Sequence, residues 1–151
     1  MRAIVLTLLL LGSVSPGFGA SVAPAKILKV LPHYLDPQGR HTLSPSLYDR
    51  DAYQAKLRKT PAARTALRFD VQWKARGTAP LKLRVELRGA AGKVPTTAVL
   101  EEPAKFSRWF SQWSAVTLKG DDYKKFGEFT GWRATLWREG ELIAEQKSFL
   151  W

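Results

Sequence analysis

Residues 65–89, TALRFDVQWKARGTAPLKLRVELRG, contain two consecutive segments in which apolar and polar side chains alternate. A period of two residues is typical of a β-strand with one face buried and the other in solvent. The sequence therefore predicts two half-buried strands in this stretch. Their inward side chains are Leu67, Phe69, Val71, Trp73 and Ala75 in the first strand and Leu81, Leu83, Val85 and Leu87 in the second.

The connection GTAP, residues 77–80, has the glycine and the proline that are common in turns. Two alternating strands joined so closely predict an antiparallel hairpin. Like charges directly opposite each other destabilise a strand pair. The favoured register of this hairpin therefore places Arg68 opposite Glu86 and Asp70 opposite Arg84.

The rest of the chain adds further short strands and turn signals. Residues 46–61 predict a surface helix that Asp49 caps and Pro61 ends. Other strands are predicted in AKILKVLPHYLD, TTAVL, WSAVTL, GWRATLW and ELIAEQKSFLW, and other helical turns in EEPAKFSRWFSQ and KGDDYKKFG. About seven strands without βαβ spacing predict an all-β, two-sheet sandwich with short helical insertions, similar in architecture to immunoglobulin and fibronectin type III domains.

An aromatic stretch, KFSRWFSQWSAVTL, occupies residues 105–118. Phe106, Trp109, Phe110 and Trp113 recur at the spacing of one helix face. A helix that bridges two sheets would bury such a stripe across an open end of the core. The stretch is therefore predicted to be mostly core material, with Trp109 as an exception that we expect at the surface.

The first 20 residues, MRAIVLTLLLLGSVSPGFGA, are predicted to be a secretory signal peptide. One arginine precedes a short apolar run, and proline and small residues follow, which is the layout of such signals. We expect a leader at residues 21–25 and one β-sandwich domain at residues 26–151, with no transmembrane segment after the signal. The predicted location is periplasmic or extracellular; an uncleaved membrane anchor is the alternative interpretation.

The chain of 151 residues has no cysteine. A lipoprotein signal is excluded because the cysteine that is acylated is missing, and a disulfide scaffold is excluded for the same reason. The folded domain must depend on an apolar core, for which six Trp, seven Phe and four Tyr supply large side chains.

Charge is unevenly distributed along the chain, whose net charge is +11. Residues 52–100 contain 11 Lys or Arg but only two acids, Asp70 and Glu86, which gives this segment a net charge of +9. Residues 101–151 contain eight residues of each sign and are balanced. A local basic field attracts anionic polymers or lipid headgroups, although a charged surface that only keeps a domain soluble is the simpler interpretation.

The sequence offers little support for catalysis, and no catalytic residue is predicted. The two histidines, His33 and His41, lie with Asp36 in one short stretch, but no spacing supplies the further ligands that a metal site needs. The acid pairs at residues 101–102 and 121–122 each precede a predicted helix, where they are explained by favourable interaction with the helix dipole. No metal site and no cofactor are predicted, and the chain is interpreted as a non-enzyme.

Binding is better supported than catalysis. In the predicted hairpin, basic side chains of two neighbouring strands would share one outer surface, because strands lie about 4.8 Å apart and side chains on one face repeat every second residue. Guanidinium groups suit phosphate, sulfate or carboxylate ligands. The candidate ligand-binding residues are Arg68, Lys74, Arg76, Lys82, Arg84 and Arg88.

We therefore predict an exported, non-enzymatic binding or accessory domain that contacts an anionic envelope polymer or glycan through this basic face. One alternative is a carbohydrate-binding module that uses exposed tryptophans, with Trp109 and Trp137 as the aromatic candidates. The other alternative is a structural subunit of an envelope assembly, with a protein partner. Nucleic acid is disfavoured as a partner because of the predicted export.

Overall fold

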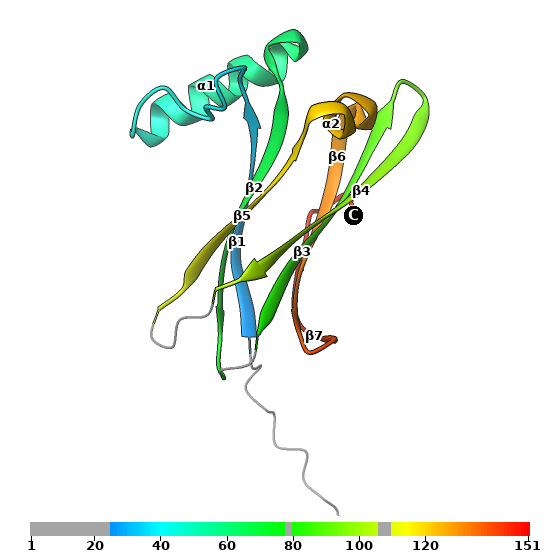
Figure 1. Ribbon diagram of the computed structural model, residues 1–151. Helices are drawn as coiled ribbons and strands as arrows, with labels where there is room; N and C mark the ends of the chain where they lie inside the picture. The colour runs from blue at the N-terminus through cyan, green and yellow to red at the C-terminus, as the bar shows by residue number, and fades with distance from the viewer. Residues whose placement is uncertain (1–24, 78–79, 106–109) are drawn as a thin grey trace, which may run out of the picture.

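A computed structural model describes residues 25–77, 80–105 and 110–151 (Figure 1). The predicted signal peptide and the leader as far as residue 24 lie outside these ranges. Within them the chain forms seven strands, two α-helices and one 3₁₀ turn, Pro61–Ala63. The strands are β1 Ala25–Leu35, β2 Ala66–Ala75, β3 Leu81–Ala91, β4 Val94–Ala104, β5 Gln112–Lys119, β6 Glu128–Arg138 and β7 Glu141–Lys147, and the helices are α1 Leu47–Lys59 and α2 Gly120–Phe126.

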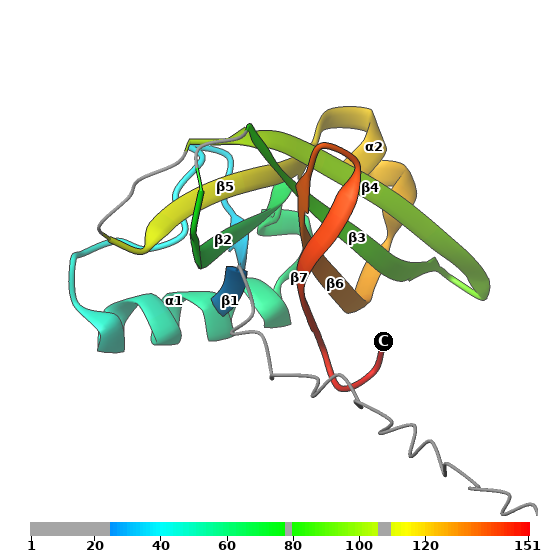
Figure 2. The same ribbon diagram turned by 90° about the horizontal axis from the view of Figure 1, so that it is seen from below.

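The strands form two antiparallel sheets that face each other (Figures 1 and 2). One sheet has three strands in the order β1-β2-β5, and the other has four in the order β4-β3-β6-β7. Helix α1 lies on the side of the three-stranded sheet, whereas α2 carries the chain from β5 to β6, from one sheet to the other. The prediction of a mainly β, two-sheet architecture is confirmed. No helix of the described ranges is long and apolar enough to cross a membrane.

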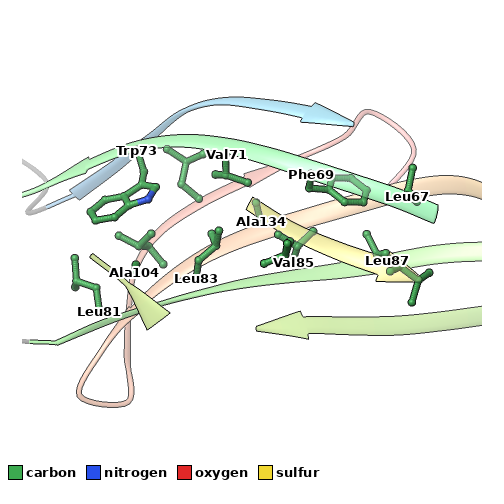
Figure 3. Packing of buried hydrophobic residues seen from close by; sticks show 14 of the residues in the cluster. Leu67, Phe69, Val71, Trp73, Leu81, Leu83, Val85, Leu87, Ala104 and Ala134 are labelled. Carbon is green, nitrogen blue, oxygen red and sulfur yellow. The ribbon is translucent and has the colours of Figure 1, made fainter. Parts of the chain in front are cut away.

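The alternation in residues 65–89 predicts the buried side chains correctly. Phe69, Val71, Leu83 and Val85 are fully buried, and Trp73 is 1% exposed. In Figure 3 the side chains of β2 and β3 point toward each other across the space between the sheets. The burial of these side chains confirms the prediction of which side of each strand faces the core.

The predicted hairpin is wrong. β2 pairs with β1 and β5, and β3 pairs with β4 and β6, so the connection between β2 and β3 carries the chain from one sheet to the other. Arg68 lies opposite His33 and Thr117, and not opposite Glu86. The physical reason is that two amphipathic strands can bury their apolar sides either next to each other or face to face, and the turn residues between them do not distinguish the two arrangements.

The predicted aromatic helix also differs from the structure. β4 continues to Ala104, and Phe110 is not helical. Phe110 is 76% exposed and Trp113 is 51% exposed, so the prediction that both belong to the core is wrong. Trp113 lies in β5, where Val116 and Leu118 take the inward positions and the alternation turns Trp113 outward. Phe106 and Trp109 lie outside the described residues.

Helix α1 packs on the free edge of β1 near the C-terminal end of that strand. The predicted helix is confirmed, but Ser46 and not Asp49 is its N-cap. Gln54 is 2% exposed, and its amide accepts a hydrogen bond from the Tyr34 backbone N–H (2.8 Å) and donates to the Tyr34 carbonyl (2.9 Å). This side chain satisfies backbone groups that a neighbouring strand would otherwise bind. Pro32 fits within β1 because the strand has a partner on one side only.

Candidate functional site

The six basic candidate residues do not share one surface. Arg68 and Lys74 lie on the outer face of the three-stranded sheet, and Arg76 follows directly after β2. The other three lie on the outer face of the four-stranded sheet, on the opposite side of the sandwich; they are Lys82, Arg84 and Arg88. The expectation of one continuous basic face is therefore wrong, because the two strands belong to different sheets.

On the four-stranded sheet, the basic side chains of β3 have partners from neighbouring strands. Glu101 of β4 accepts hydrogen bonds from Arg84 Nε (2.6 Å) and Lys82 Nζ (3.3 Å). These hydrogen bonds, from Arg84 first and then Lys82, hold the pKa of Glu101 below its usual value. The Arg88 guanidinium lies 4.1 Å from the centroid of the Trp151 ring, a cation–π contact. Much of the positive charge on this face is therefore balanced or covered.

The next row of the same face continues this pattern. Arg133 of β6 lies 3.4 Å from Glu86 of β3 and 2.6 Å from Glu145, which belongs to β7. Opposite charges thus occur on adjacent strands across the whole width of the sheet. Exposed ion pairs of this kind contribute little to stability, but they leave little free charge to attract an anion.

The outer face of the three-stranded sheet is different. Lys26 of β1 lies directly opposite Lys74 of β2, and Lys29 lies opposite Gln72, which in turn is opposite Trp113 of β5. All three lysines are exposed, and within the described residues none of them takes part in an ion pair. We call Lys26, Lys29, Lys74 and Trp113 the lysine face.

The three strands of this sheet contain a single acid, Asp70, and its carboxylate is already occupied. Asp70 Oδ1 accepts hydrogen bonds from Arg68 Nε (3.0 Å) and Nη2 (2.7 Å), and Oδ2 lies 3.2 Å from His33 Nδ1. Burial alone would raise the pKa of Asp70, but the contacts with His33 and Arg68 outweigh burial and lower it. Asp70 therefore neutralises Arg68 and leaves the charge of the lysines unbalanced.

A polar cluster next to the lysine face contains both histidines. The rings of His33 and His41 are stacked with centroids 4.9 Å apart. Burial, and then the neighbouring His33 and Arg68, lower the pKa of His41.

Asp36 makes contacts of its own within this cluster. Its carboxylate accepts hydrogen bonds from the Arg40 backbone and side chain and from the Tyr53 hydroxyl. Burial alone would raise the pKa of Asp36, but these hydrogen bonds outweigh it and lower the pKa to about 2. In the part of the chain that the structure describes, no group of three or more His, Asp or Glu is arranged to hold a metal.

The two aromatic candidates cannot be compared, because Trp109 lies outside the described residues. Trp137 lies half-buried on the outer face of the four-stranded sheet, opposite Lys82 and Leu142. Its Nε1 donates a hydrogen bond to Thr135 Oγ1 (2.9 Å). Trp137 also lines a pocket with a volume of about 440 Å³.

The sequence reasoning missed Lys26, Lys29 and Trp113 as candidate residues. The alternation of Ala25, Lys26 and Ile27 does indicate that Lys26 points away from the core. What could not be found is the register that brings these residues to the same face as Lys74, because it joins strands far apart in the chain. No protein-family model, no curated protein and no solved structure matches the chain.

Proposed function

We propose that this protein is an exported, non-enzymatic binding domain that contacts an anionic polymer or glycan of the cell envelope through the lysine face. The observation that carries the proposal is the unbalanced charge of Lys26, Lys29 and Lys74 on two neighbouring strands. Adjacent strands lie about 4.8 Å apart and same-face residues about 7 Å apart along a strand. Ammonium groups at such intervals suit repeated anionic groups along a polymer better than a single small anion.

We further propose that the domain is an immunoglobulin-like sandwich, because the strand order supports that class. If the strands are lettered A, B, C, C′, E, F and G in chain order, the three-stranded sheet is A-B-E and the four-stranded sheet is C′-C-F-G. Immunoglobulin-type sandwiches place A, B and E next to one another in that order in one sheet, and C, F and G in the other. In such domains the sheets are a scaffold, and function depends on surface residues.

The predicted export selects among anionic partners. Outside the cytoplasm the available polyanions are cell-wall polymers, acidic glycans and lipid headgroups. Trp113 provides an aromatic ring beside the cations. Proteins that bind single-stranded nucleic acids combine basic and aromatic side chains in the same way. The compartment is therefore the reason to favour an envelope polymer over nucleic acid.

The test is chromatography on immobilised heparin, a sulfated polyanion, with two matched triple variants. The first is Lys26→Glu, Lys29→Glu, Lys74→Glu. The control is Lys56→Glu, Lys59→Glu, Lys93→Glu, which changes three exposed lysines elsewhere and alters the net charge equally. We expect the first variant to lose at least about tenfold in affinity and to show a weaker salt dependence, since fewer counterions are released on binding. Equal losses in both variants, or no retention of the parent protein, would refute the lysine face as a binding site.

A structural role in an envelope assembly is a second candidate. Phe149 is fully exposed and Leu150 is 69% exposed, next to β6, where the Ser148 N–H bonds the Trp132 carbonyl. Adjacent exposed apolar side chains are typical of contacts between proteins. Recovery of one partner in stoichiometric amount, and its loss in Phe149→Ser, would support this role.

A further inference from the structure

The pocket beside Trp137 is on the opposite side of the sandwich from the lysine face and differs from it chemically. Its wall includes Lys82, Arg84 and Glu101 from β3 and β4, and Glu139 from the turn between β6 and β7. Its volume of about 440 Å³ falls in the range of small-molecule sites, roughly 300–1,000 Å³.

Trp137 offers an apolar surface to this pocket. Its indole N–H already donates to Thr135 Oγ1, an interaction that orients the ring. The Arg84 guanidinium lies over one face of this ring, 5.5 Å from its centroid, in a cation–π contact, so a stacked ligand must use the other face or displace Arg84. With its one donor occupied, the indole can contribute dispersion and the burial of apolar area, the forces that hold the C–H face of a sugar ring on an aromatic ring.

The charged groups of the pocket balance one another. Two cations, Lys82 and Arg84, face two carboxylates, Glu101 and Glu139, and Glu101 bonds both cations. A charged ligand would therefore gain little from a net field. Each of these groups keeps free hydrogen-bonding positions, because an ammonium has three donors, a guanidinium five, and a carboxylate about four acceptor sites. Hydroxyl groups, which both donate and accept, match such a mixed set.

The backbone at Glu139 gives independent support. Glu139 has φ 50°, and among the described residues it is the one non-glycine residue with positive φ. The two-residue turn that it forms with Gly140 favours Asn, Asp or Gly at this position. Residues held in such conformations are concentrated at functional sites. Here the unfavourable residue places a carboxylate at the pocket.

We propose that this pocket binds a neutral saccharide, with a sugar ring stacked on Trp137 and its hydroxyl groups bonded by Glu101, Lys82 and Glu139. The site is separate from the lysine face and does not depend on the function proposed for it. A protein with both sites would hold a neutral glycan on one side and an anionic polymer on the other.

The experiment is saturation-transfer NMR of the purified protein with soluble cellohexaose, chitohexaose, maltohexaose and laminarihexaose at millimolar concentration. We expect one of these oligosaccharides to bind, and Trp137→Ala to weaken binding at least about tenfold, or roughly 1.4 kcal/mol. Trp113→Ala, which removes an exposed indole on the opposite sheet, should bind as the parent does. Transfer of saturation from the protein to the C–H protons of a sugar ring, and its loss in Trp137→Ala, would place that sugar ring on the indole.

The variant Glu139→Gly separates a loss of sugar binding from a loss of stability. Glycine adopts positive φ without strain, so this variant should not lower Tm, but it removes the carboxylate and should weaken sugar binding. The lysine-face triple variant should bind the sugar normally, which separates failure of this inference from failure of the proposed function. Absence of binding to all four oligosaccharides, or unchanged binding in both Trp137→Ala and Glu139→Gly, would overturn the inference.

Discussion

The two sheets have similar inner faces and very different outer faces. β2 and β3 each bury every second side chain, and each carries basic residues on the other side. On the four-stranded sheet, neighbouring strands supply Glu101 and Glu145 to the cations. On the three-stranded sheet, β1 and β5 supply no acid. A basic residue on a strand is therefore available to a ligand only if the adjacent strands leave it unpaired.

The same comparison separates the two kinds of ligand that we propose. Unbalanced lysines on an open sheet favour an extended polyanion, since attraction acts without a cavity. Balanced charges around Trp137 favour an uncharged ligand that is held by contact and hydrogen bonds. If the sheets are equal inside and unequal outside, core substitutions in either sheet should destabilise the protein alike, whereas surface substitutions in the two sheets should differ in their effect on binding.

The largest effects are expected in the shared core. Phe69→Ala in β2 should lower the free energy of unfolding by about 3–5 kcal/mol, and Leu83→Ala in β3 by about 2–5 kcal/mol, because each leaves a cavity between the sheets. Lys29→Ala, on the outer face of the same sheet as Phe69, should change it by no more than about 0.5 kcal/mol. Urea unfolding followed by fluorescence measures all three. A tolerated Phe69→Ala would contradict the face-to-face packing of β2 and β3.

Acid should destabilise the protein mainly through the side that carries the three-stranded sheet, because Glu101, whose pKa is lowered on the other sheet, forms exposed ion pairs that contribute little to stability. The pKa of His41 is lowered from 6.5 in the folded state, so the folded protein takes up this proton less readily than the unfolded chain. Its contribution to stability is complete above pH 6.5 and declines as the pH falls below that value. Asp36 and Asp70 also have lowered pKa values, so their contributions are complete above about pH 4 and are lost at lower pH, for Asp36 as the pH falls through about 2.

Urea unfolding at several pH values measures this acid dependence. Stability should fall first below pH 6.5 and then again below about pH 4. His41→Gln should remove the first decrease and leave the second. If His41→Gln leaves the profile between pH 7.5 and 5 unchanged, the stacked histidines do not contribute as described.

Glu101→Gln is expected to have the smallest effect on stability. Its effect on heparin binding tests whether paired carboxylates distinguish the two sheets. This change leaves Lys82 and Arg84 without their shared carboxylate and should make the four-stranded sheet more like the lysine face. The protein should elute from heparin at higher salt, with little change in Tm because the ion pairs are exposed. Glu102→Gln, the adjacent exposed acid of β4, alters the net charge equally and is the control. Equal shifts for both variants would mean that only net charge matters.

Only some residues of the two candidate sites could be predicted from the sequence. Lys74 was correctly expected to point away from the core, because it alternates with inward residues of its own strand. Trp137, named as an aromatic candidate, is half-buried on the outer face of its sheet. Trp113 was misplaced because a helical spacing of aromatic residues crosses the boundary where β5 begins. Lys26 and Lys29 gain their significance only from β2, which is more than 35 residues away along the chain.

What the sequence determined by itself is the side of each strand that enters the core, because the alternation of side chains follows from the geometry of a single extended chain. What only the tertiary structure decided is which strands are neighbours. Both a hairpin and a stacked pair bury Phe69 and Val85, and the choice between them depends on contacts with strands far along the chain. That choice placed Lys74 of β2, which has no ion-pair partner among the described residues, on the same surface as Trp113, and placed Lys82 and Arg84 of β3, which share Glu101, on the opposite surface beside Trp137.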